Sequence, residues 1–119
     1  MPPDMRSAKW LEDVRDAASF ILEVCASLDA DAFDQNRLVR QAVERNFQII
    51  GEALRRLERH APVVAGRISP LPRIIAFRNI IVHAYDGIDP AVMWQVIRDD
   101  LPPLLQTVED LLKDVDAGR

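Results

Sequence analysis

Four polar residues within one apolar segment have side chains that can take part in catalysis. They lie between residues 78 and 85, and they are Arg78, Asn79, His83 and Tyr85. In a helix, Asn79 would lie one turn from His83, and Arg78 would lie two turns from Tyr85. Histidine exchanges protons near neutral pH, and arginine forms bidentate hydrogen bonds with phosphate oxygens. On spacing alone, however, a satisfied structural Arg78–His83 pair is the more common arrangement.

Charge is unevenly distributed along the chain. The net charge is −4, but residues 37–78 contain nine arginines and three glutamates, so this segment carries +6 and the flanks together carry −10. The simplest interpretation is a solvated, arginine-rich face. No lysine occurs among these cations, and arginine is the side chain better suited to binding phosphate, which favours RNA as a ligand. The nine are Arg37, Arg40, Arg45, Arg55, Arg56, Arg59, Arg67, Arg73 and Arg78.

The composition excludes several classes of protein. Cys25 is the single cysteine of the 119 residues, which excludes an internal disulfide and fits a reducing compartment. No basic segment followed by an apolar one begins the sequence, and no apolar run approaches the roughly 20 residues of a membrane span. Cysteine, histidine and carboxylate residues do not show metal-ligand spacing. We therefore expect a soluble cytoplasmic protein without a metal or other cofactor.

Apolar residues recur at three-and-four spacing in four segments, which predicts four amphipathic helices. These cover about residues 4–28, 34–59, 69–85 and 90–111. Asp34 is the expected N-cap of the second helix, and a loop is expected around Pro62. Pro102 and Pro103 predict a kink in the fourth helix. Short connections and one core predict an all-α fold, an antiparallel bundle of four to five helices forming a single domain over residues 1–119.

The third predicted helix has two apolar faces. The stripe expected to face the core consists of Ile74, Phe77, Ile80, Ile81 and Ala84. The opposite side carries Leu71, Ile75 and Val82 beside the polar cluster. A helix that is apolar almost all round is usually buried all round, and a small bundle cannot bury both faces of one helix internally. The sequence therefore predicts a homodimer in which this second face meets its two-fold mate.

Several segments resemble one known group of proteins. Residues 77–85, F-R-N-I-I-V-H-A-Y, resemble the R-x4–6-H motif of the HEPN superfamily, in the R-N-x-x-x-H-x-Y form of its HepT-like group. The segments W-L-E-D-V at 10–14 and I-G-E-A at 50–53 are similar to further family motifs, as are Trp94 and D-L-P at 100–102. Ala84 stands where many members carry an acidic residue. Together the matches cover nearly the whole chain.

This resemblance implies a function. HepT-like proteins are dimeric, metal-independent ribonucleases that act as toxins of type VII-like toxin–antitoxin pairs, with both R-x4–6-H motifs facing one cleft. Their antitoxin is a minimal nucleotidyltransferase (MNT), which transfers AMP to the tyrosine of the H-x-Y element, here Tyr85. The implied substrate is RNA, cleaved by attack of a 2′-hydroxyl on the adjacent phosphate. His83 would serve as general base or acid and Arg78 would stabilise the phosphorane, while Asn79 orients His83 or the phosphate.

Two other interpretations remain open at this point. The chain could be a non-catalytic helical module that dimerises and presents substrate to a nucleotidyltransferase partner. It could also be a dimeric bundle in which Arg78 and His83 form only interface pairs.

Two residues of the second predicted helix bear on the site. Glu52 could reach Arg78, and the sequence leaves open whether the two form a buried ion pair. Gly51 lies in mid-helix, where glycine costs about 1 kcal/mol relative to alanine, so we expect another backbone to approach closely there. Trp10 and Trp94 are expected to pack in the core or an interface rather than to stack on bases.

Overall fold

The computed structural model describes residues 4–69, 71–83 and 88–117, except the side chains of 80–83 and 116–117. Within these residues every element is a helix, which confirms the all-α prediction. The described part contains seven helices rather than four, because two of them are short and the last predicted helix is interrupted. They are α1 (Met5–Cys25), α2 (Ala30–Gln35), α3 (Arg37–His60), α4 (Pro62–Ala65), α5 (Leu71–His83), α6 (Pro90–Asp99) and α7 (Leu101–Ala117).

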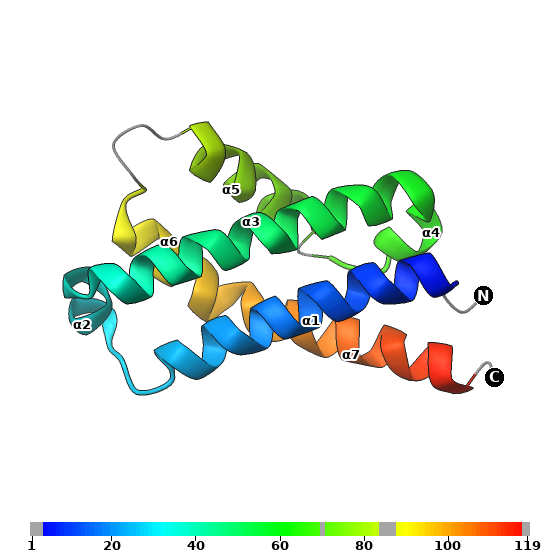
Figure 1. The fold of residues 1–119 in the computed structure, drawn as a ribbon, viewed down its shortest axis with the longest axis horizontal. Coiled ribbons are helices and arrows are strands. Elements are labelled where there is room, and N and C mark those ends of the chain that lie inside the picture. The colour runs from blue at the N-terminus through cyan, green and yellow to red at the C-terminus, as the bar shows by residue number, and fades with distance from the viewer. Residues whose placement is uncertain (1–3, 70, 84–87, 118–119) are drawn as a thin grey trace.

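Three long helices lie along the molecule (Figure 1). In that view α1 runs in the opposite direction to both α3 and α7, and it packs against each of them. α5 packs on α3, and the short α2 packs against α3 and α6. One apolar core joins them, with large, fully buried side chains that include Leu11, Phe33, Phe47, Ile50 and Leu101.

The segment before α3 differs from the prediction. Asp34 does not cap α3, because it lies inside α2. Asp29 caps α2 by accepting a hydrogen bond from the amide of Ala32 (2.8 Å), and Asn36 caps α3 by accepting from the amide of Val39 (3.1 Å). The burial of Phe33 explains the extra helix, since one helical turn lets its ring pack against Trp94, with 5.2 Å between ring centroids.

Proline shapes the two other departures. The loop expected around Pro62 contains α4, in which proline takes the first turn and Val64 and Ala65 are buried. In place of the predicted kink, the last helix is interrupted at a single residue, Asp100, between α6 and α7. Pro102 and Pro103 lie in the first turn of α7. A proline amide cannot donate a hydrogen bond, so the ladder between α6 and α7 is broken there.

α5 does not present the second face as expected. Ile74 and Phe77 are buried, as predicted, but Leu71 is also buried, with 3% of its surface exposed. The prediction for Leu71 is wrong because α5 starts beside α4, where Leu71, Ile68 and Ala65 line one depression. Ile75 is half-buried and packs against the core. The predicted core contacts of Ile80 and Ile81, and the outer position of Val82, involve undescribed side chains, and Ala84 also falls outside the described residues.

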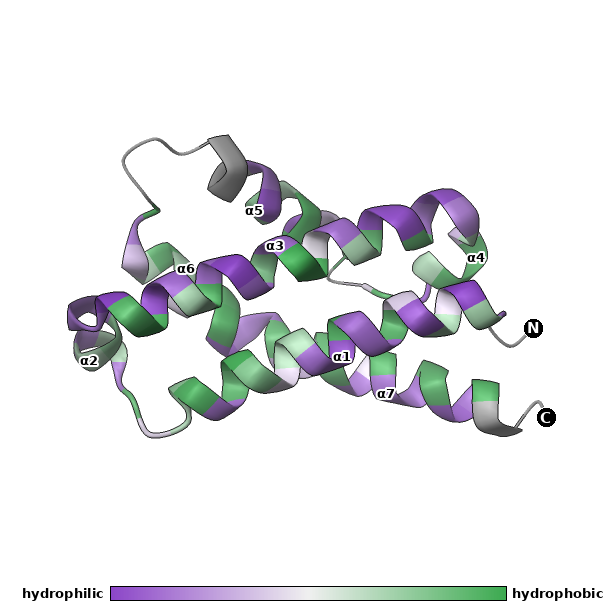
Figure 2. Ribbon diagram, viewed as in Figure 1, coloured by the Kyte–Doolittle hydropathy of each residue, from purple (hydrophilic) through white to green (hydrophobic). Residues whose placement is uncertain are grey.

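Hydropathy follows the packing. Along α1 and α3, hydrophilic and hydrophobic turns alternate around each helix (Figure 2), as is typical of a helix with one face on the core. In the described part of the chain, no helix combines the length and the apolar character that crossing a membrane requires.

Candidate functional site

Arg78 reaches the site by crossing α3 at Gly51. A Cβ atom built on Gly51 would lie 2.4 Å from both Cβ and Cγ of Arg78 and 3.2 Å from its Cδ. Real Cβ atoms do not approach other atoms so closely, so only glycine leaves room for the stem of this arginine. The close approach predicted at Gly51 therefore exists, but it is made by a side chain of α5 and not by a backbone.

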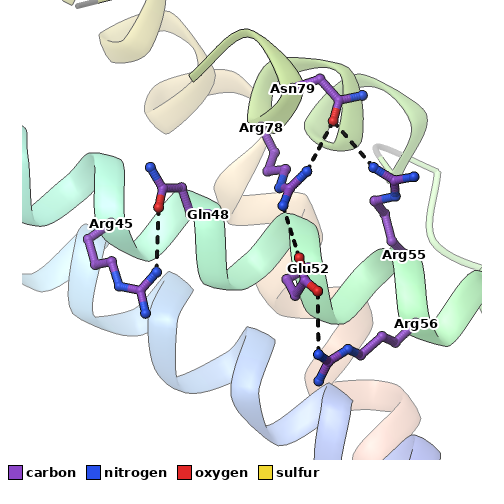
Figure 3. Close-up of polar contacts among 7 residues, drawn as sticks. All are labelled: Arg45, Gln48, Glu52, Arg55, Arg56, Arg78 and Asn79. Atoms are coloured by element: carbon purple, nitrogen blue, oxygen red, sulfur yellow. Dashed lines mark hydrogen bonds and ion pairs between the residues drawn. The ribbon is translucent and has the colours of Figure 1, made fainter. Parts of the chain in front are cut away.

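The guanidinium group of Arg78 is held by two polar partners (Figure 3). Its Nη2 donates to Oε2 of Glu52 at 2.9 Å, and its Nη1 donates to Oδ1 of Asn79 at 3.3 Å. The Glu52–Arg78 pair is thus formed, although only the arginine is largely buried: the exposed side-chain fractions are 21% for Arg78 and 48% for Glu52. Nε of Arg78 is buried without a hydrogen-bond partner among the described residues.

Two further arginines of α3 complete this network. Glu52 also binds Arg56, with 3.4 Å between its Oε1 and Nη2 of the arginine. Oδ1 of Asn79 accepts a second, long hydrogen bond of 3.5 Å from Nη1 of Arg55. One carboxylate and one amide oxygen therefore bridge three guanidinium groups from two helices, which fixes the position of Arg78 more firmly than either contact alone.

A pocket of about 310 Å³ lies beside this network. Side chains from three helices line it, α1, α3 and α5, so the bundle itself assembles the pocket. The contributing polar residues are Asp13, Arg45, Gln48, Glu52, Arg56 and Arg78. Because arginines outnumber carboxylates there, the pocket suits an anionic ligand such as a phosphate diester.

Three of the five predicted site residues are brought together in the described structure: Arg78, Asn79 and Glu52. His83 is the last residue of α5, but its side chain is not described, and Tyr85 lies outside the described residues. The expected Asn79–His83 contact is therefore not tested. The side-chain oxygen of Asn79 accepts hydrogen bonds from Arg55 and Arg78. Within the part of the chain that the structure describes, no group of three or more His, Cys, Asp or Glu side chains is close enough to hold a metal ion.

The sequence did not single out Arg55 and Arg56 as site residues. Arg56 could have been found, because it lies four residues after Glu52 and such pairs face one another on a helix. No comparable signal identifies Arg55, since its partner Asn79 is 24 residues away and the contact depends on how α5 lies on α3.

Comparisons with known proteins point to one family. Residues 14–111 match the family model described as "Ribonuclease HepT-like". A Methanocaldococcus jannaschii protein described as a candidate RNase is 31% identical over 100 residues, covering 84% of this chain and 91% of the relative. A Thermococcus cleftensis protein named "Probable ribonuclease HepT" is 30% identical over 104 residues, covering 87% of this chain and 94% of the relative. No solved structure matches significantly.

The family model covers most of the chain, and its span includes α3, α5 and the network around Arg78. Both relatives align over nearly their whole length. The chain therefore belongs to the HepT-like ribonuclease family.

Proposed function

We propose that this protein is a metal-independent endoribonuclease that acts as the toxin of a type VII-like toxin–antitoxin pair. The observation that carries the proposal is the guanidinium group of Arg78, which Glu52 and Asn79 hold at the edge of an arginine-lined pocket. A cation fixed in advance stabilises the charge that develops on a phosphate during cleavage, because it does not have to reorganise in the transition state.

The proposed reaction breaks one phosphodiester bond. The 2′-oxygen of the RNA attacks the adjacent phosphorus while the bond to the 5′-oxygen breaks, which yields a 2′,3′-cyclic phosphate and a 5′-hydroxyl. His83 accepts the proton of the 2′-hydroxyl, and a protonated histidine donates one to the leaving 5′-oxygen. Arg78 binds the non-bridging oxygens of the phosphorane, and Asn79 orients the phosphate or His83. In a homodimer, the two copies of His83 can take the two proton-transfer roles.

Regulation would act through Tyr85. AMP transferred to this tyrosine by an MNT-type partner adds a negative phosphate seven residues after Arg78 in the sequence. This phosphate can pair with Arg78 and exclude the phosphate of the substrate. Tyr85→Phe should therefore leave RNA cleavage intact and make the toxin insensitive to the nucleotidyltransferase. If Tyr85→Phe also abolished cleavage, the tyrosine would have a catalytic role.

The test of the proposal compares wild type, His83→Ala and Arg78→Ala, both for growth arrest on induced expression and for cleavage by purified protein. Wild type should arrest growth and cleave RNA in the presence of EDTA, and both variants should lose these activities while remaining folded. The rate should show a bell-shaped profile between about pH 5 and about pH 9, because one histidine must be neutral and one protonated. Loss of wild-type cleavage in EDTA, or a flat profile, would contradict the mechanism.

The same experiment tests the non-catalytic alternative. If the protein only presents substrate to a nucleotidyltransferase, the His83→Ala variant should bind that partner as wild type does. Wild type should then have no RNase activity. The polar network around Arg78 favours the catalytic interpretation, since a presenting module does not need a preorganised guanidinium group.

A further inference from the structure

A polar stripe runs along the outer side of α3. Arg45, Gln48, Glu52, Arg56 and Arg59 fall within about 80° of one another on the helix, opposite the apolar residues that face the core. Four of these five side chains appear along α3 in Figure 3. From Arg45 to Arg59, 15 residues, the stripe extends about 21 Å. It passes Glu52, the residue that binds Arg78, so it leads directly to the candidate catalytic site.

Two adjoining pockets follow this stripe. The first is the pocket beside Arg78, and the second, of about 440 Å³, is lined by Arg6, Trp10, Arg56, Arg59 and His60. Trp10 and Arg56 line both, so the two depressions adjoin where α1 and α3 meet, and together they are called the α1–α3 groove.

The groove carries excess positive charge. Five arginines line its two halves, against the carboxylates of Asp13 and Glu52. Glu52 is engaged by two of those arginines, and Asp13 accepts from Lys9 at 2.9 Å. Within the described residues, Arg6 and Arg59 form no ion pair, and both are exposed. Arg6 and Arg59 can thus bind phosphates without first breaking an ion pair seen among the described residues.

An aromatic ring and a guanidinium group lie together at the far end of the groove. The guanidinium group of Arg6 lies over the ring of Trp10, 5.5 Å from its centroid, and His60 meets that ring edge-on at 5.3 Å. Unstacked bases of single-stranded RNA stack on aromatic rings and on arginine planes, whereas bases within a duplex are not accessible to such surfaces. The Arg6–Trp10 pair therefore favours a single strand over a duplex.

From these observations we infer that the α1–α3 groove is the path of a single-stranded RNA, leading from the Arg6–Trp10 pair along Arg59 and Arg56 to Arg78. This inference rests on the proposed ribonuclease function and adds the surface and the kind of RNA that the enzyme binds. Arginines bind the backbone phosphates, and one unstacked base lies on the Arg6–Trp10 pair.

The test separates binding from cleavage. The probe is a short single-stranded RNA with 2′-O-methyl riboses, which has no free 2′-hydroxyl, and its dissociation constant is measured by fluorescence anisotropy over a range of salt concentrations. The variants are Arg6→Gln, Arg59→Gln and their combination. Arg98→Gln is the matched control, since Arg98 lies over Trp94 at 5.9 Å in the same way but on α6, outside the groove.

Each groove variant should weaken binding and lower the slope of log Kd against log salt by about 0.7, so that the double variant loses about 1.4. The KM for an unmodified substrate should rise in parallel, with a much smaller change in kcat, and Arg98→Gln should behave as wild type. The duplex form of the same probe should bind less tightly than the single strand.

Two other outcomes have distinct meanings. If wild type cleaves RNA but the double variant keeps the wild-type Kd and salt slope, the groove is not the RNA path and the proposed function stands. Equal affinity for duplex and single strand would overturn the stacking role of the Arg6–Trp10 pair. If wild type neither binds nor cleaves RNA, the proposed function fails together with this inference.

Discussion

The stem of Arg78 occupies the space that a side chain at Gly51 would need. In an exposed helix interior, replacing glycine by alanine stabilises by about 1 kcal/mol, because alanine loses less backbone entropy. At Gly51 the new methyl group would lie 2.4 Å from two atoms of Arg78, and such overpacking typically costs about 1–3 kcal/mol. We therefore expect Gly51→Ala to lower the free energy of unfolding, measured as a lower urea midpoint at unchanged m-value. A higher midpoint would show that α5 moves away from α3 without penalty.

Glu52 binds the guanidinium group of Arg78, and in the proposed mechanism it positions this arginine without touching the reacting atoms. It is half-exposed, so losing its charge should change the free energy of unfolding by less than about 1 kcal/mol. The effect on cleavage should be larger, because the guanidinium group would lose its ionic partner. We expect Glu52→Gln to lower kcat by about tenfold, equivalent to about 1.4 kcal/mol of transition-state stabilisation. Glu58→Gln, an exposed change on the same helix, is the control and should retain wild-type kcat.

A stability loss without a kinetic loss in Glu52→Gln would make the Glu52–Arg78 pair purely structural. That outcome would leave Arg55 and Asn79 as the groups that hold the guanidinium network in place.

At the level of elements, Asp4 joins the start of α1 to the end of α3. Its carboxylate caps α1 by accepting from the amide of Ser7 at 2.9 Å, and it binds Nε2 of His60 at 2.9 Å. The hydrogen bond from the Ser7 amide, followed by that from His60, lowers the pKa of Asp4 from 3.8 to about 2. Since the pKa is lower in the folded state, the stabilisation is present above about pH 4 and is lost as the pH falls towards about 2.

Asp4→Asn tests this linkage, because asparagine can still cap the helix but carries no charge. The Tm of wild type should exceed that of Asp4→Asn at neutral pH, and the difference should shrink as the pH falls from about 4 to about 2. Asp29→Asn, at the cap of α2, is a control for removing a charge from a capping aspartate. A Tm difference that stays constant down to about pH 2 would mean that the charge of Asp4 does not contribute.

The long elements were predictable from sequence because their apolar residues repeat with the helical period. The stripes through Leu11 and Phe47 identify α1 and α3 in this way. The short helices were not predictable, because α2 exists through the packing of one residue, Phe33, and α4 through a turn that buries Val64. Periodicity needs several turns to be visible, and these segments have too few.

For the site, sequence spacing predicted the proximity of Arg78, Asn79 and Glu52 only in part. The first two are neighbours in the chain, and the R-x4–6-H resemblance marks them. Contacts between α3 and α5 depend on the angle and offset of two helices, which no local pattern encodes. Gly51 was the useful signal, since a costly glycine in mid-helix indicated that something crosses there, although not that it was Arg78.

At the scale of the whole molecule, we propose that two copies of His83 act in one cleft, so activity should depend on how subunits combine. We predict that the protein is a homodimer, measurable by analytical ultracentrifugation. Wild type is mixed with an equal amount of His83→Ala, and the subunits are allowed to exchange at random. About a quarter of the dimers then carry His83 in both subunits. Cleavage should then fall to about a quarter of the wild-type rate at equal total protein, because each reaction needs one histidine as base and one as acid.

Independent sites would give a different result. If each protomer cleaved RNA with its own His83 alone, the mixture would retain about half of the wild-type rate, since half of the protomers would be intact. Mixing wild type with the control Arg98→Gln under the same exchange conditions should leave the rate unchanged, which shows that exchange itself does not inactivate the enzyme. A rate near one half would assign both proton transfers to groups within one protomer. His60, which lies beside Trp10 in the groove, would then be the candidate for the second acid–base residue.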